Sequence, residues 1–291
     1  MNRSACFVFP LATALFLSVF TAGRVAAADD RPVEDASKIA TQEIRDKALP
    51  TLFLVGDSTV KVGTKGQRGW GEEFAHFFNL SKINVVNRAI GGRSSRTFQT
   101  EGRWDKVLAD LKPGDFVLVQ LGTNDGGKIN DNSRARATLP GVGEETEEID
   151  NLLTKKHEVV HTFGWYMRKY ATDTKAKGGT PILCSLVPRK IWTKDGKIER
   201  AAATYGAWTA KAAQDTGAYF VDLNEIVAQT YESLGEDKVN TLFADEHTHT
   251  TVAGAQVNAA CVIAGLKGLK GDPLGKYFSA DAESVEAFPV K

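Results

Sequence analysis

The sequence predicts an α/β domain, a three-layer α/β/α sandwich around a central, mostly parallel sheet. Short apolar runs alternate along the chain with longer segments of helical periodicity. The first run, residues 51–55, has the continuous apolar pattern of a strand buried on both faces, and it stops at Gly56-Asp57-Ser58. Strands separated by helices imply right-handed crossovers, and therefore a parallel sheet between two helical layers.

The remaining elements follow from the same patterns. Strands are expected at residues 83–87, 115–121, 180–186 and 218–223. Helices are expected at residues 70–79, 103–111, 158–177, 200–216 and 252–269. Two long polar stretches, 126–153 and 187–199, fit neither pattern. Both follow predicted strands, so we expect them to project over the crevice at the carboxyl ends of the strands.

The N-terminus has the pattern of an export signal. Arg3 precedes a mostly apolar segment, 5–20, and the small residues Val25-Ala-Ala-Ala28 follow it. A membrane anchor is disfavoured, because Pro10 interrupts the segment and the segment is short for a bilayer span of about 20 residues. We therefore expect a signal peptide at 1–28 and a protein that is secreted or periplasmic.

The rest of the chain is expected to contain a polar N-terminal arm at 29–47 and a single domain at 48–291. Loss of Arg3 and Arg24 with the signal reduces 36 basic residues to 34, against 36 acidic ones. This balance argues against a nucleic-acid partner and offers no basic face for a membrane. A hydrophobic content of 42% is typical of a globular domain with a substantial core.

The cysteines predict no metal cluster and no disulfide framework. Cys6 leaves with the signal, and Cys184 and Cys261 each lie in an apolar segment. Two small buried thiols are therefore expected rather than a disulfide, although an oxidising compartment would permit one.

Polar clusters at the ends of the predicted elements supply the parts of an acyl-transfer site. Ser58 follows the first strand and is a candidate nucleophile. Gly92 belongs to a Gly-Gly pair after the second strand, and Asn124 follows the third, where backbone and amide N–H groups can meet an oxyanion. His249 is a candidate base that Glu246 can orient. Taken singly, each cluster also fits a turn or a helix cap.

The Glu-His-Thr-His run at 246–249 also permits a metal site. His247 and His249 would share one face of an extended segment, and Asp57 or Asp125 could complete the ligands from across the crevice. We favour acyl transfer, because serine, glycine, asparagine and acid-x-x-His account for every part that this chemistry needs. No metal and no cofactor are therefore expected.

Together the clusters resemble the sequence blocks of the SGNH (GDSL-type) hydrolases, and they are most similar to the rhamnogalacturonan acetylesterase branch. The matching stretches are Gly56-Asp-Ser-Thr59, Gly69-Trp-Gly-Glu72, Gly91-Gly-Arg-Ser-Ser-Arg96, Thr100-Glu-Gly-Arg103, Leu121-Gly-Thr-Asn-Asp-Gly-Gly127, Val239-Asn240, His247-Thr-His-Thr250 and Ala253-Gly-Ala255. They occur in the family's order over most of the chain from residue 52 to about 269.

The resemblance implies an SGNH/flavodoxin-like fold and assigns roles to the matching residues. Ser58 is then the nucleophile, His249 the base, and the oxyanion hole is formed by Ser58, Gly92 and Asn124. Relatives usually have Asp where this chain has Glu246. We favour Glu246 as the orienting acid because it keeps the three-residue spacing, with Asp245 as the alternative.

A second departure is Thr123, where the branch often has His. This position should affect the lining of the pocket more than the chemistry.

The resemblance also implies a substrate: an acetylated plant-wall polysaccharide or oligosaccharide, above all acetylated rhamnogalacturonan or pectin. The enzyme would remove acetyl groups through a Ser-His-acid triad and an acetyl-enzyme. Trp192 is a candidate platform for a sugar ring. Arg93, Arg96 and Arg189 are candidate partners for galacturonate carboxylates.

Three other functions remain open from the sequence. One is a non-catalytic polysaccharide-binding protein on the same fold. Another is a metal-dependent hydrolase built on His247 and His249. The third is a hydrolase of lipid esters or thioesters, which needs an apolar acyl channel that the charged stretches 126–153 and 187–199 do not suggest.

Overall fold

The computed structural model describes residues 44–289. Its central sheet has five parallel strands in the order β2-β1-β3-β6-β7. The strands are β1 (Thr51–Gly56), β2 (Asn84–Asn87), β3 (Phe116–Gln120), β6 (Thr180–Cys184) and β7 (Tyr219–Val221). The predicted α/β fold with a parallel sheet is confirmed. The strand order is that of flavodoxin-like folds, in which the chain reverses direction across the sheet between β1 and β3.

Side chains of β1 alternate between two hydrophobic cores. Leu52 and Leu54 belong to one core and Phe53 and Val55 to the other, and all four are fully buried. This alternation is the period of two expected of a strand covered on both faces. The continuous apolar run in the sequence therefore has a direct structural cause.

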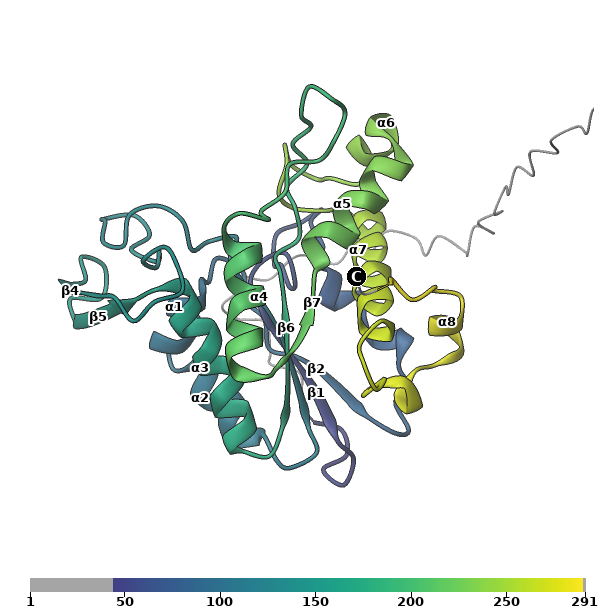
Figure 1. Cartoon of the computed structure of the whole chain (residues 1–291), viewed down its shortest axis with the longest axis horizontal. Coiled ribbons are helices and arrows are strands. Elements are labelled where there is room, and N and C mark those ends of the chain that lie inside the picture. Colours follow the sequence, from purple (N-terminus) through teal and green to yellow (C-terminus); the bar gives the residue numbers. More distant parts are fainter. Residues whose placement is uncertain (1–43, 290–291) are drawn as a thin grey trace, which may run out of the picture. The chain divides into compact units, whose positions relative to one another are not determined.

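Each face of the sheet is covered by its own helices (Figure 1). One face carries α2 (Arg103–Asp110), α3 (Phe163–Ala176) and α4 (Tyr205–Thr216), and the other carries α5 (Leu223–Leu234) and α7 (Val252–Lys267). Shorter elements are η1 (Trp70–Glu72), η2 (Ala75–Phe77), α1 (Ser95–Thr100), α6 (Glu236–Asn240), η3 (Gly275–Tyr277) and α8 (Ala280–Glu283).

Part of the expected helix at 158–177 is a strand. β5 (His157–His161) pairs in antiparallel register with β4 (Thr146–Asp150), which lies in a stretch expected to have no regular structure. The helix begins only at Phe163, because the Thr162 hydroxyl accepts the N–H of Trp165 and caps it. The hairpin projects from the face that carries α3 (Figure 1).

Three other expectations differ from the structure. Residues 70–79 contain two 3₁₀ turns rather than one helix, and the N–H groups of Trp70 and Gly71 donate to the carbonyls of Thr59 and Val60. The helix expected at 200–216 begins later, at Tyr205. Helix α5 was not predicted, although Asp222 caps it by accepting the N–H of Glu225.

The expected signal peptide at 1–28 and the expected arm up to residue 43 lie outside the described residues. The last part of the arm, 44–47, contacts the domain: Ile44 packs against one core, and the Asp46 N–H donates to the Asn84 side chain at 3.1 Å. Among residues 44–289, no helix combines the length and the apolar character needed to cross a bilayer. Cys184 and Cys261 are free and buried, as predicted.

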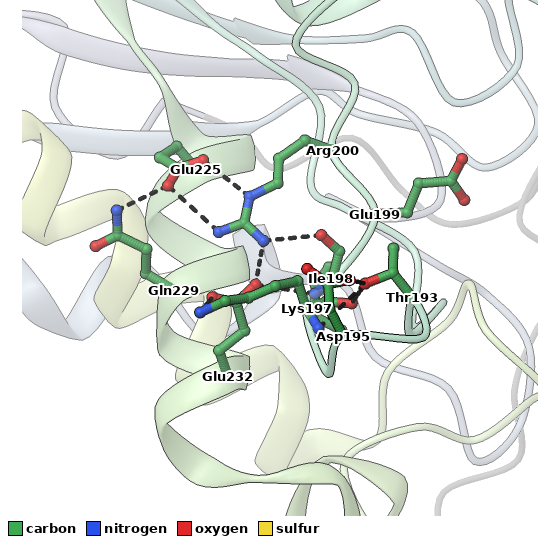
Figure 2. Close-up of a pocket in the computed structure, with 9 residues that line it drawn as sticks. All are labelled: Thr193, Asp195, Lys197, Ile198, Glu199, Arg200, Glu225, Gln229 and Glu232. Carbon is green, nitrogen blue, oxygen red and sulfur yellow. Dashed lines mark hydrogen bonds and ion pairs between the residues drawn. The ribbon is translucent and has the colours of Figure 1, made fainter.

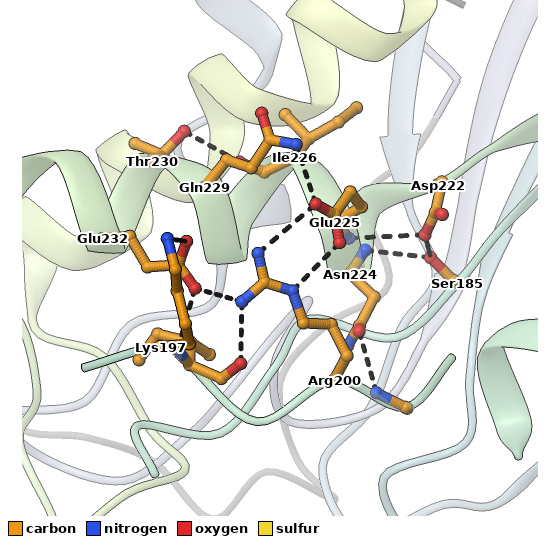
Figure 3. Close-up of polar contacts among 12 residues, drawn as sticks. Ser185, Lys197, Arg200, Asp222, Asn224, Glu225, Ile226, Gln229, Thr230 and Glu232 are labelled. Carbon is orange, nitrogen blue, oxygen red and sulfur yellow. Dashed lines mark hydrogen bonds and ion pairs between the residues drawn. The ribbon is translucent and has the colours of Figure 1, made fainter. Parts of the chain in front are cut away.

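The stretch after β6 is clamped onto α5 by Arg200. The guanidinium pairs with Glu225, at 3.0 Å from Nε to Oε2, and with Glu232, while Glu232 also accepts the N–H of Ile198 at 2.9 Å. Figure 2 shows these groups around an open hollow of about 600 Å³. Figure 3 shows that the network continues through Asn224 to the end of β6. All three guanidinium nitrogens of Arg200 thus have hydrogen-bond partners within the chain.

We expect Glu232→Gln to destabilise the fold by about 1 kcal/mol at pH 6. The hydrogen bond from Arg200 lowers the pKa of Glu232 to about 2. Because this pKa is lower in the folded state than in the unfolded chain, where it is near 4.5, ionised Glu232 stabilises the fold at pH values above about 4.5. This stability is lost as the pH falls toward 2. The difference between wild type and variant, measured by urea unfolding at pH 6 and pH 3, should therefore shrink at pH 3. Glu199→Gln, at an exposed position of the same hollow, serves as the control.

Candidate active site

Strand register brings the predicted site residues together. In the parallel pairing of β1 with β3, Gly56 lies opposite Gln120. The chain leaves both strands at the same edge of the sheet, so Ser58 and Asn124 follow within a few residues of adjacent strand ends. Both side chains are almost buried, with 9% and 8% of their residue surface exposed.

Ser58 sits in a tight turn that its neighbour holds in place. The Asp57 carbonyl accepts the N–H groups of Val60 and Lys61, at 3.1 and 3.0 Å. The buried Asp57 carboxylate accepts both the N–H and the hydroxyl of Thr59, at 2.8 and 2.7 Å. Burial raises the pKa of Asp57, and the hydrogen bonds from Thr59 oppose that effect.

The turn also depends on a close backbone approach. A Cβ atom added to Gly69 would lie 2.3 Å from the carbonyl carbon of Val60. Any other residue at position 69 would therefore push the segment that precedes Trp70 away from the turn that carries Ser58.

A hydroxyl, an imidazole and a carboxylate lie in series at this edge. Ser58 Oγ is 2.9 Å from His249 Nε2, and His249 Nδ1 is 2.5 Å from Asp245 Oδ2. This is the geometry in which a base removes the proton of a nucleophile while an acid fixes the tautomer of the base.

The Asp245 carboxylate is held by the backbone that it precedes. Its Oδ1 accepts the N–H groups of His247, Thr248 and His249, at 3.2, 2.7 and 2.9 Å. Partial burial alone would raise the pKa of Asp245, but the N–H groups of His249 and Thr248 and the imidazole together lower it. The acid is therefore ionised at neutral pH and available to accept from the imidazole.

The preference for Glu246 as orienting acid is corrected by this geometry. Glu246 is exposed, whereas Asp245 bonds to His249. Because the Asp245 carboxylate accepts the N–H groups of residues 247 to 249, the chain from 245 to 249 curls and brings the earlier acid to the imidazole. The spacing is therefore four residues rather than the three that we assumed.

The Gly-Gly segment lies directly against the serine. A Cβ added to Gly91 would be 3.5 Å from Ser58 Cβ. Gly92 has a φ of +81°, a left-handed conformation that favours glycine. The Asn124 amide donates to the Arg93 carbonyl at 2.9 Å, which leaves one N–H of the amide for a ligand. The predicted oxyanion residue Gly92 thus follows the residue that lies against Ser58, and Asn124 is hydrogen-bonded to the same segment.

A buried carboxylate joins the two loops that hold these donors. Asp125 Oδ1 accepts both the N–H and the hydroxyl of Ser95, at 3.0 and 2.5 Å. Burial raises the pKa of Asp125 to about 7, the Ser95 hydrogen bonds oppose this, and the nearby Asp57 adds to the increase. The Asn124 and Asp125 side chains therefore both fix the end of β3 to the segment at α1.

One proposed substrate-binding residue is structural. Arg96 is fully buried and forms a two-point ion pair with Glu158, with Nε–Oε1 and Nη2–Oε2 distances of 2.6 and 2.7 Å. Its Nη1 donates to the carbonyls of Ile129 and Ala137, both at 2.8 Å. Since these contacts engage all three guanidinium nitrogens, the prediction that Arg96 binds the substrate is wrong. Instead it anchors the long stretch after β3.

The other candidates lie in different environments. Arg93 pairs with Glu101 at 2.9 Å and donates to the Gly91 carbonyl. Arg189 is exposed, on a segment whose next residue donates its N–H to the His247 carbonyl. Trp192 packs partly buried against the core. Carbohydrate contacts by Arg93, Arg189 and Trp192 stay predictions.

The alternative metal site lacks a matching arrangement of ligands. Both ring nitrogens of His249 are engaged, by Asp245 and Ser58, and Nδ1 of His247 lies 2.7 Å from the Thr248 hydroxyl. Within residues 44–289, no three His, Cys, Asp or Glu side chains are grouped so as to hold a metal ion.

Sequence reasoning missed Arg136. It lies in the stretch 126–153, and its Nη1 donates to the Gly92 carbonyl at 2.8 Å. Its only signal in the sequence was its place in a loop that follows a strand, which many surface arginines share.

Known proteins resemble this chain in sequence and structure. The model of the GDSL-like lipase/acylhydrolase family matches residues 54–257. A rhamnogalacturonan acetylesterase of Emericella nidulans is 34% identical over 209 residues, which are 72% of this chain and 81% of that protein. A probable rhamnogalacturonan acetylesterase of Bacillus subtilis, YesY, is 32% identical over 225 residues, covering 75% and 93%. The crystal structure of YxiM from Bacillus subtilis matches with a TM-score of 0.61 and 28% identity, covering 75% of this chain and 56% of that longer one.

Asp245→Asn should lower kcat for an aryl acetate by about 10³ to 10⁴-fold, because an amide that donates to Nδ1 would stabilise the wrong imidazole tautomer. Glu246→Gln is the matched control, and it should stay within about threefold of wild type. A larger loss of kcat in Glu246→Gln than in Asp245→Asn would show that Glu246, three residues before His249, is the orienting acid.

Asn124→Ala should reduce kcat by about 10² to 10³-fold with little change in KM, because it removes a donor that acts on the developing oxyanion. The thermal midpoint of the variant should be measured alongside, since Asn124 also donates to the Arg93 carbonyl. Turnover equal to wild type in a folded variant would exclude Asn124 from the oxyanion site.

Proposed function

Because the chain belongs to the GDSL-like lipase/acylhydrolase family, we propose that it is an exported carbohydrate acetylesterase of the rhamnogalacturonan acetylesterase type. The chain is an ester hydrolase by its family. The observation that carries the catalytic part of the proposal is the series of hydrogen bonds from Ser58 through His249 to Asp245.

Acylation begins when Ser58 Oγ attacks the carbonyl carbon of the acetyl ester. His249 Nε2 takes the hydroxyl proton, and the ionised Asp245 stabilises the imidazolium that forms. The negative charge on the former carbonyl oxygen is met by the N–H groups of Ser58 and Gly92 and by the Asn124 amide. Collapse of this intermediate breaks the bond to the sugar oxygen, which takes the proton from His249 and leaves as a hydroxyl.

Deacylation uses the same groups on water. His249, again neutral, removes a proton from a water molecule that attacks the acetyl-enzyme. The second tetrahedral intermediate occupies the same oxyanion donors. Its collapse breaks the bond to Ser58 Oγ, which regains a proton from His249, and acetate is released.

The carbohydrate substrate is supported by the two named rhamnogalacturonan acetylesterases and by the polar walls of the site. The stretches beside it carry charged side chains, among them Arg93, Arg136 and Arg189, which are poorly suited to line a channel for a fatty acyl chain. Export is supported by the sequence of residues 1–28.

The test compares wild type with Ser58→Ala on an aryl acetate, an aryl octanoate and acetylated rhamnogalacturonan, each with and without EDTA. We expect wild type to prefer acetate, to release acetate from the polysaccharide and to keep its activity in EDTA, and Ser58→Ala to lose at least 10³-fold. A preference for octanoate would indicate a lipid esterase. Polysaccharide binding without turnover would indicate a binding protein, and loss of activity in EDTA would indicate a metal-dependent hydrolase.

A further inference from the structure

Arg136 is a cationic side chain that bonds to the Gly-Gly segment next to Ser58. It has no role in the acylation or deacylation steps. Its Nη1 donates to the Gly92 carbonyl at 2.8 Å. A Cβ added to Gly92 would lie 3.6 Å from the same nitrogen. A Cβ added to Gly91, the preceding residue, would lie 3.5 Å from Ser58 Cβ, so Arg136 bonds to the backbone one residue away from the segment that lies against Ser58.

The backbone around Arg136 is fixed from both sides. Ala135 and Ala137 are buried, and Ala135 has a φ of +39°, a conformation that is uncommon for a residue other than glycine. The buried Arg96 donates to the Ala137 carbonyl at 2.8 Å, and the Thr138 N–H donates to the Asp125 carbonyl at 3.0 Å. These contacts fix the backbone on both sides of Arg136. The unusual φ of Ala135 is a form of backbone strain that is often found near functional residues.

The charge of Arg136 is not neutralised at close range. Within the part of the chain that the structure describes, no carboxylate lies within 4.0 Å of this guanidinium, whereas Arg93 and Arg96 pair with Glu101 and Glu158. The hydrogen bond to Gly92 uses one of five N–H donors. Partial burial and the nearby Arg134 lower the pKa of Arg136, whereas Asp57, Asp125 and Asp131 act on it from longer range in the opposite direction. The guanidinium stays charged at any physiological pH.

We infer that Arg136 binds a carboxylate of the substrate, on the ring that carries the acetyl group or on its neighbour. The inference rests on the proposed esterase function and adds a specificity for anionic esters. A guanidinium fixed at the edge of a site, with donors left over, suits planar two-point recognition of a carboxylate. Arg136 is better placed for this than Arg96, whose donors are occupied within the fold.

The test uses two small acetate esters that differ in charge, 4-acetoxybenzoate and its methyl ester. We expect Arg136→Gln to lower the ratio of kcat/KM for the anionic ester to that for the neutral ester by about tenfold, mainly through KM. Activity on the neutral ester should also fall severalfold, because the variant loses the hydrogen bond to Gly92. Arg136→Lys keeps the charge but not the planar guanidinium, so its ratio of kcat/KM values should lie between those of wild type and Arg136→Gln.

Arg134→Gln is the matched control, because it removes the same charge from an exposed position two residues away. Its ratio should change by less than twofold. An equal change in both variants would show a long-range charge effect, and an unchanged ratio in Arg136→Gln would reduce Arg136 to a support of the Gly92 loop. Either result overturns the inference.

Binding provides a measurement that does not need turnover. Unacetylated oligogalacturonate should bind Ser58→Ala at least tenfold more tightly than Ser58→Ala/Arg136→Gln in calorimetry, and equal or absent binding overturns the inference. The proposed function is tested separately. If wild type deacetylates rhamnogalacturonan but Arg136→Gln leaves the ratio of kcat/KM for the two esters unchanged, only the role of Arg136 is refuted. If Arg136→Gln changes that ratio but wild type does not act on the polysaccharide, only the proposed substrate is refuted.

Discussion

The site depends on the register of one pair of strands. Gly56 of β1 lies opposite Gln120 of β3, so the turns that follow both strands begin at the same height on the edge of the sheet. A slip of one residue would turn the buried side chains of β1 to the wrong face. Since Phe53 and Leu54 fill opposite cores, both cores oppose such a slip. The packing that stabilises the sheet therefore also sets the separation of Ser58 and Asn124.

Beyond the strand ends, buried polar contacts replace the sheet as the source of rigidity. Asp125 bonds to Ser95, Asn124 to the Arg93 carbonyl, and Arg96 to the carbonyls of two loop residues. Loops that carry functional residues are the more mobile parts of most domains. Here each loop near Ser58 is tied to another by a side chain with low exposure, so the donors are positioned before a substrate arrives.

Much of the fold could be predicted from the sequence, because a doubly covered parallel sheet leaves a strong signal. The five strands appear as apolar runs such as 51–55 and 180–186. The polar clusters that follow the strands contain Ser58 and His249, which are hydrogen-bonded in the structure. The hairpin β4–β5 and the whole of helix α5 were not predicted. The exposed strands of the hairpin differ little in composition from a loop.

The two wrong residue assignments have a common cause. Asp245 and Glu246 are adjacent acids, and only the curl of the backbone at 245–249 decides which one meets the imidazole. Arg96 looks like any arginine in a polar motif, and only its burial against Glu158 shows that it serves the fold. Sequence gives the residue type and its approximate place, whereas the partner of a charged side chain depends on contacts between distant segments.

The environments of three carboxylates separate their roles around one histidine. Asp245 is partly exposed and accepts several hydrogen bonds, which lower its pKa and keep it charged beside the imidazole. Asp57 and Asp125 are fully buried, and burial raises the pKa of both. Burial therefore disfavours the charged form of the two carboxyls that hold the turn and the loops, whereas the hydrogen bonds around Asp245 favour a charged partner for the imidazole.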